Sequence, residues 1–255
     1  FLFGLFLLGR LNLPNQGRFV VLQALCLFSF NFICFYQATS MMHSGLVSVI
    51  FSLATIFNAI NARIFFGDKI RPQTILAGLI GATGLVLLFW RDLTINFNTD
   101  VIQGVGWATT GTLFFSIGNM MSRKNSMYGV NPITANSWGM CIGAIILVTI
   151  AGVTGSNFAI PNSPTYIWAL IYLAIIGSVV GFSTYLMMVA RIGSDRAAYT
   201  TVLFPVVALI MSTLFEGFEW HTTAFLGIAF TIIGNLVMFA RFPRRDKLFI
   251  TSSKN

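Results

Sequence analysis

Charge is the scarcest property of this 255-residue sequence. Only 9% of its residues are charged, whereas 56% are hydrophobic; a soluble domain carries about 25% charged residues. A folded chain this apolar cannot cover its surface with polar side chains, so the composition excludes an ordinary soluble domain and indicates a lipid bilayer as its surroundings. The net charge of +8 is explained by basic loops on the cytoplasmic side, and we expect no nucleic-acid partner.

Catalytic and metal-binding motifs are also missing. The sequence has no HExxH, no GxSxG, no phosphate-binding glycine loop followed by lysine, and no pair of mid-span aspartates. Its three cysteines lie inside apolar runs without CxxC spacing, and His43 and His221 show no ligand pattern around them. We therefore expect no enzyme, no cofactor and no metal site. An intramembrane enzyme or an assembly scaffold is the hypothesis of another class.

Long apolar runs separated by short polar turns are what the sequence does contain. Each full run can cross a hydrocarbon core of about 30 Å as a helix. The first stretch, FLFGLFLL, is too short for this, and we expect it to be the end of a partial span whose start precedes residue 1. Eight full spans are predicted, at 19–42, 45–66, 73–90, 102–122, 133–155, 165–190, 197–217 and 222–241.

Loop charges give these spans an orientation. If the side that holds Arg10 is called the inner side and the sides alternate, Arg91 alone of the 15 Lys and Arg falls on the outer side. The inner side holds Arg10, Arg18, Arg63, Lys69, Arg71, Arg123, Lys124, Arg191, Arg196, Arg241, Arg244, Arg245, Lys247 and Lys254. This positive-inside pattern predicts a multi-pass protein, in a bacterial cytoplasmic (inner) membrane, with a cytoplasmic C-terminus.

Two hairpins, 44–90 and 196–239, repeat one pattern. Three glycines recur at offsets of 150, 149 and 150 residues: Gly67 with Gly217, Gly78 with Gly227, and Gly84 with Gly234. The first hairpin makes its turn on the inner side and the second on the outer side, so the repeat is inverted. Inverted repeats are a known plan of secondary transporters.

The two stretches IFFGDKIRPQTILAGLIGATGLVLL and VLFPVVALIMSTLFEGFEWHTTAFLGIAFTIIGNLVMF resemble the EamA family of the drug/metabolite transporter superfamily. The resemblance implies an all-α polytopic membrane protein with ten helices in two inverted five-helix repeats. It also implies a central cavity and export of amino acids, other metabolites or toxic compounds. We expect an N-terminally truncated member: an incomplete first repeat at 1–95 that lacks its first helix, a second repeat at 96–245, and a cytoplasmic tail at 246–255.

The sequence departs from the family in one respect. The family often has a proline in the helix before each hairpin turn. Pro205 fits this pattern, whereas the first repeat has Leu53, Ala54 and Thr55 in that region. A proline-dependent hinge is therefore predicted only in the second half.

Polar side chains inside the spans are the candidates for the cavity lining, because a polar group in hydrocarbon needs protein or water as a partner. Asn58 either contacts substrate or joins two helices, and Asn61 lies further round the same helix. Tyr36, Trp107 and Tyr199 either line the pore or lie at the membrane interface. The full set of substrate-binding candidates is Asn31, Tyr36, Ser52, Thr55, Asn58, Trp107, Ser116, Asn119, Tyr185, Tyr199, Thr201 and Pro205.

Two charged residues fall near the ends of spans. Arg63 either extends its head group to the inner interface or pairs with Asp68 or Asp195. Glu216 is the one carboxylate that could sit at membrane depth. A raised pKa there would support proton coupling, whereas the alternative is an ordinary interfacial helix end.

These features predict a secondary transporter that exports small molecules by alternating access. No mid-span counter-charge is evident, so we expect uncharged or zwitterionic substrates. The runner-up is a transporter of nucleotide sugars or phosphorylated metabolites from the same superfamily, which a mid-span Lys or Arg would favour. The expected partners are the small-molecule substrate and the bilayer, and the sequence makes no prediction of oligomeric state.

Overall fold

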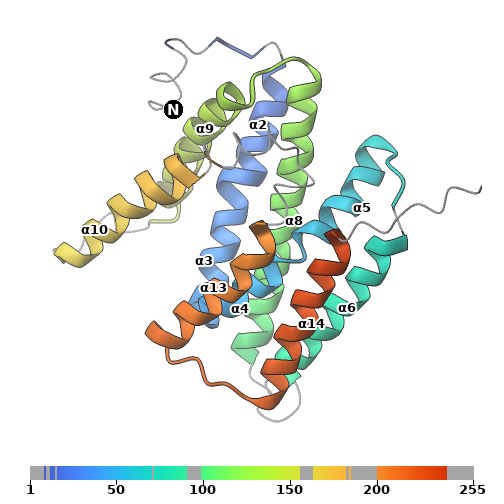
Figure 1. Ribbon diagram of the computed structural model, residues 1–255. Helices are drawn as coiled ribbons and strands as arrows, with labels where there is room; N and C mark the ends of the chain where they lie inside the picture. The colour runs from blue at the N-terminus through green and yellow to red at the C-terminus, as the bar shows by residue number, and fades with distance from the viewer. Residues whose placement is uncertain are drawn as a thin grey trace, which may run out of the picture.

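The computed structural model describes residues 9, 12–14, 16–70, 72–90, 99–155, 163–181, 184 and 200–239. Within these residues every regular element is a helix (Figure 1). The predicted helical class is therefore confirmed for this part of the chain.

The first half begins with a long rod of three consecutive segments. These are α2 (Gly17–Leu25), the π-helical turn η1 (Cys26–Phe30) and α3 (Asn31–Met41). The chain then turns at Met42 and His43 into a second rod.

The second rod consists of α4 (Ser44–Phe51) and α5 (Ala54–Phe66). It ends at Gly67, whose positive φ of 72° is the left-handed conformation that glycine adopts without strain. The chain then reverses into α6 (Pro72–Leu88).

The second half contains the remaining helices. They are α8 (Thr99–Met127), α9 (Pro132–Val153), α10 (Pro164–Tyr172) with the π-helical η2 (Leu173–Val180), α13 (Thr200–Phe215) and α14 (Thr222–Phe239). Gly217, with φ 69°, follows α13 as Gly67 follows α5.

Where the structure describes a helix end, predicted and observed bounds agree within a few residues, except for α8, which extends from 99 to 127 rather than from 102 to 122. The predicted end of the span 165–190 lies outside the described residues. By length and composition, three helices of the described chain can cross a membrane: Gly17–Met41, Ser44–Phe66 and Pro132–Val153. Shorter apolar helices occupy Pro72–Leu88, Pro164–Val180 and Thr222–Val237. The chain is thus a helical protein with membrane-spanning helices.

A local break interrupts the second rod. The second rod is not one continuous helix: it breaks at Ser52 and Leu53, where there is no proline, whereas α13 continues through Pro205. At the break, the Leu53 amide donates to the carbonyl oxygen three residues back, Ile50 O, at 3.0 Å. In a regular α-helix it would donate to the fourth residue back. The Ser52 hydroxyl donates to Val49 O at 2.6 Å, and the Thr55 hydroxyl donates to Ser52 O at 2.8 Å. Hydroxyl groups thus add hydrogen bonds to backbone carbonyls beside the break.

The helices form a bundle in which sequence-distant segments lie side by side (Figure 1). The most extensive contact joins α6 to α14, and others join α3 to α8, α5 to α8 and α4 to α13. In contrast, α10 and η2 bury none of their side chains and project from the side of the bundle in Figure 1.

Glycines set the contact between α6 and α14. A Cβ on Gly84 would lie 2.6 Å from the Gly227 carbonyl oxygen, and a Cβ on Gly234 would lie 2.9 Å from the Ala77 carbonyl oxygen. Position 84 of α6 corresponds to 234 of α14 under a shift of 150 residues, and position 77 corresponds to 227. The contact between 84 and 227 therefore corresponds to the contact between 234 and 77. The antiparallel helices therefore meet through reciprocal positions.

Candidate functional site

A polar seam joins α5 to α8 inside the bundle. The Asn61 amide donates to the Ser116 hydroxyl at 2.8 Å, and both side chains are buried. The Asn119 amide donates to the Asn58 carbonyl oxygen at 3.4 Å, in a half-buried position. The structure thus brings together three predicted candidates, Asn58, Ser116 and Asn119, and adds Asn61.

Aromatic rings lie beside the break between α4 and α5. The ring of Phe51 meets Phe115 of α8 edge to face at 4.7 Å between centroids, and it meets Phe35 of α3 in the same way at 5.6 Å. Phe115 directly precedes Ser116 on α8, so this aromatic cluster borders the seam along that helix.

Asn31 begins α3 directly after the π-helical turn. Its side chain is only 4% exposed, and its carbonyl oxygen has no hydrogen-bond partner within the described chain. A buried acceptor without a partner costs about 1–3 kcal/mol, and π-helical turns are frequent at functional sites. A donor group on a bound molecule would satisfy this oxygen.

The other predicted candidates are more dispersed. Tyr36 is 64% exposed and stacks on Phe32, and Trp107 is 39% exposed, as aromatic residues facing lipid would be. The hydroxyls of Ser52 and Thr55 donate hydrogen bonds to backbone carbonyls of their own segment. Pro205 is buried within α13. Tyr185, Tyr199 and the Thr201 side chain lie outside the described residues.

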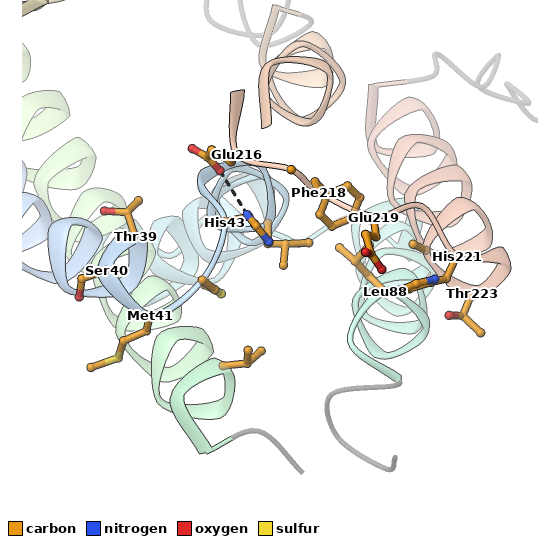
Figure 2. Close-up of a pocket in the computed structure, with 15 residues that line it drawn as sticks. Thr39, Ser40, Met41, His43, Leu88, Glu216, Phe218, Glu219, His221 and Thr223 are labelled. Atoms are coloured by element: carbon orange, nitrogen blue, oxygen red, sulfur yellow. Dashed lines mark ion pairs between the residues drawn. The ribbon is translucent and has the colours of Figure 1, made fainter. Parts of the chain in front are cut away.

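A cavity of about 750 Å³ opens at the end of the bundle where the α3–α4 and α13–α14 turns meet (Figure 2). Its walls combine apolar side chains with titratable groups. Figure 2 shows His43, Glu216, Glu219 and His221 around it, together with Phe218 and Leu88.

Glu216 follows the last residue of α13 and reaches across to the start of α4. Its carboxylate accepts hydrogen bonds from the Ser44 amide at 2.8 Å, the Ser44 hydroxyl at 2.5 Å and the Ser212 hydroxyl at 2.7 Å. His43 Nδ1 lies 3.7 Å away. The Glu216 carboxylate therefore caps the N-terminus of α4, where free backbone amides favour an anion.

These contacts decide the direction of the pKa shift. Burial alone would raise the pKa of Glu216, but the hydrogen bonds from Ser44 and Ser212 and the nearby His43 outweigh it and lower the pKa below its usual value. This direction is opposite to the raised pKa that would support proton coupling through Glu216.

A second carboxylate is bound at the other end of the bundle. Asp68, in the α5–α6 turn, accepts hydrogen bonds from both terminal nitrogens of Arg123 on α8, at 2.6 and 3.4 Å. The Arg123 guanidinium also lies 4.1 Å over the Phe66 ring. The hydrogen bond from Arg123 lowers the pKa of Asp68. Asp68 thus pairs with Arg123 and not with Arg63, whose side chain is exposed.

Three buried amides that the sequence did not single out form a chain between α2, α8 and α9. The Gln23 amide donates to Asn136 at 2.6 Å, and the Asn125 amide donates to Gln23 at 2.9 Å. The amide at Gln23, inside an apolar run, was the available signal. Asn125 lay beyond the predicted end of its helix, so its burial was not expected.

Comparison with known proteins identifies the family. The EamA-like transporter family matches residues 1–90 and 102–240. The chain belongs to the EamA-like transporter family. The family assignment agrees with the resemblance carried by the two hairpins.

Individual relatives of this EamA-like chain carry transporter names. It is 25% identical over 202 residues to the uncharacterized transporter YyaM of Bacillus subtilis, covering 78% of this chain and 65% of that protein. It is 22% identical to the uncharacterized transporter YdfC of the same organism, covering 88% and 72%. It is 24% identical to a probable amino-acid metabolite efflux pump of Escherichia coli, covering 76% and 66%.

The chain thus spans about two thirds of the length of such relatives. A solved crystal structure aligns with 92% of this EamA-like chain and 80% of its own, with a TM-score of 0.64 at 17% identity. At that identity the likeness shows the fold alone.

Proposed function

We propose that this EamA-like chain is part of a secondary transporter that exports small uncharged or zwitterionic metabolites, amino acids among them, by alternating access. Two inverted halves, 1–95 and 96–245, rock against each other in the cytoplasmic membrane, and the C-terminus lies in the cytoplasm. The reciprocal contact between α6 and α14 is the observation that carries this proposal.

A contact pair that exchanges under a constant shift is what a two-fold axis between two equivalent antiparallel helices requires. The pair Gly84–Gly227 maps onto Gly234–Ala77 under the shift of 150. Small residues let the two backbones approach closely, as at helix contacts in membranes. The α6–α14 pair therefore suits the stationary axis about which the halves move.

Two further features repeat at the same shift. The left-handed glycines Gly67 and Gly217 stand 150 residues apart. The π-helical turn at Cys26–Phe30 maps to 176–180, which lies within η2. Both halves thus carry a weakened helix at equivalent positions.

The seam supports the choice of substrate. Its side chains are neutral hydrogen-bond donors and acceptors: Asn58, Asn61, Ser116 and Asn119. The side-chain oxygen of Asn31, four residues before the aromatic Phe35, is a further acceptor without a partner in the described chain. Neutral hydrogen-bonding groups beside aromatic rings suit uncharged or zwitterionic molecules. The name of the Escherichia coli relative, an amino-acid metabolite efflux pump, is compatible with this class.

Untargeted metabolite profiling of cells with and without the gene tests the proposal. Export predicts that one class of neutral or zwitterionic metabolite rises outside the expressing cells and falls inside them. An unchanged metabolite profile on both sides of the membrane would count against it.

A further inference from the structure

Each hairpin turn of this chain binds the opposite half through one carboxylate. The α13–α14 turn belongs to the second half, and its Glu216 holds Ser44 of the first half. The α5–α6 turn belongs to the first half, and its Asp68 holds Arg123 of the second half. Both acids flank a left-handed glycine, Gly67 or Gly217.

The two contacts lie at opposite ends of the bundle. In Figure 1 the α5–α6 turn is at the upper right, whereas the α13–α14 turn is at the bottom of the view. Each contact therefore joins the two halves at its own end of the bundle.

The Glu216 contact joins the start of α4 to the end of α13 beside the cavity that Glu216 lines. A Cβ on Gly45, the residue after Ser44, would lie 2.9 Å from the side chains of Leu209 and Ser212 on α13. The start of α4 thus lies directly against the end of α13, with the carboxylate across the junction. The rings of Phe218 and His43 add an edge-to-face contact, at 5.8 Å between centroids.

The Asp68 contact has the same design with different partners. The fork of Arg123 binds both carboxylate oxygens, and Phe66 stacks under the guanidinium. Both contacts remain partly exposed to water: the Asp68 and Arg123 side chains are each 45% exposed, and the Glu216 side chain is 36% exposed. Partly exposed ionic contacts are weak enough to break and re-form.

We propose that Glu216 and Asp68 are the latches of two gates: Glu216 closes the outer side and Asp68 closes the inner side. This inference rests on the proposed alternating-access function. Opening toward one side requires the release of one carboxylate while the other stays bound. The described conformation has both latches closed.

Accessibility of single cysteines in membrane vesicles tests the latches. In a chain with Cys26, Cys34 and Cys141 replaced by alanine, Leu46→Cys reports on the outer cavity and Met121→Cys on the inner end. Both positions are buried, at 6% and 4% exposure. A membrane-impermeant maleimide is applied to right-side-out vesicles for the first reporter and to inside-out vesicles for the second.

Glu216→Gln should raise labelling at position 46 several-fold and leave position 121 unchanged, and Ser44→Ala should give a smaller rise at the same position. Glu219→Gln is the matched control, because Glu219 lines the same cavity without a hydrogen bond or ion pair to the rest of the described chain.

Asp68→Asn should raise labelling at position 121 alone, with Lys69→Gln as its control. The exchange Asp68→Arg with Arg123→Asp should restore the parent rate.

Equal labelling of the Glu216→Gln and Glu219→Gln proteins would overturn the outer latch. A rise at both reporters in Glu216→Gln and in Ser44→Ala would also overturn it, because loosening of the whole bundle would then be the cause. Solute flux separates this inference from the proposed function. If the protein transports solute but the substitutions leave cysteine labelling unchanged, only the latches are refuted. If labelling changes as predicted but no solute is transported, the proposed transport function is refuted.

Discussion

Asn58 and Asn61 stand three residues apart on α5, yet the structure uses them differently. Asn61 is buried and forms a hydrogen bond of 2.8 Å, whereas Asn58 is half-buried and its bond to Asn119 is 3.4 Å long. A short buried bond holds helices together, and a long one is free to exchange partners. The sequence singled out Asn58, because Asn61 lies further round the helix and near its inner end; that Asn61 meets Ser116 depends on how α5 packs on α8.

Leucine at each position tests this division. Asn61→Leu should cost about 1 kcal/mol of stability, because the Ser116 hydroxyl loses its partner. Asn58→Leu should leave the melting temperature in detergent within about 2 °C of the parent and reduce flux about tenfold, the effect of one hydrogen bond to substrate. Melting and vesicle flux are measured on both proteins. Parental flux in Asn58→Leu would remove it from the cavity.

The two carboxylates predict a pH dependence of stability. The folded-state pKa of Glu216 is lowered from its usual value of 4.5, and that of Asp68 is lowered from 3.8. The unfolded chain then binds more protons, so this stability is present above the usual values and is lost as the pH falls through the lowered folded-state values. Melting temperature should drop on acidification below about pH 4.5. In the double variant Glu216→Gln with Asp68→Asn, the melting temperature should fall less steeply with acidification than in the parent. An identical fall in the two proteins would contradict this assignment.

At the scale of elements, the contact between α6 and α14 leaves no room for a side chain. Gly84→Ala should destabilise the protein by about 1–3 kcal/mol, because its Cβ would lie 2.6 Å from backbone of α14. Gly106→Ala in α8 is the control: no atom lies within 4 Å of its Cβ, so it should be neutral or stabilising by up to about 1 kcal/mol. Thermal unfolding in detergent measures both. Equal stability of the two variants would mean that the helices are not held this closely.

Pro205 offers a second test at this scale. It is buried inside α13, at the position that corresponds to Thr55 under the shift of 150. Pro205→Ala restores a backbone hydrogen bond, so stability should not fall, but a stiffer α13 should lower flux. Val207→Ala, on an exposed position of the same helix, should keep parental flux. Full flux in Pro205→Ala would rule out a hinge there.

Helix positions were largely predictable because apolar runs and their glycine and proline turns mark where spans begin and end. The extension of α8 to Met127 was not, since Ser122 to Ser126 are polar and an apolar run marks the membrane rather than the helix end. The break at Ser52 was missed because no glycine or proline signals it. The partners of Asp68 and Gln23 depend on which helices pack together, and that information lies in the fold.

At the scale of the whole molecule, the inverted arrangement predicts opposite membrane sides for the two hairpin turns. Single cysteines at Lys69 and Thr222 should be labelled by an impermeant maleimide from the inner and the outer side respectively. Inside-out and right-side-out vesicles distinguish the two. Labelling of both positions from the same side would contradict the inverted halves.

Transport itself is the central claim, and directional flux in inside-out vesicles measures it most directly. Vesicles that contain the protein are offered a panel of neutral, zwitterionic and phosphorylated metabolites, alongside vesicles without it. The account predicts uptake of at least one neutral or zwitterionic compound above the empty vesicles and none of the phosphorylated ones. Uptake equal to that of empty vesicles across the whole panel would contradict it.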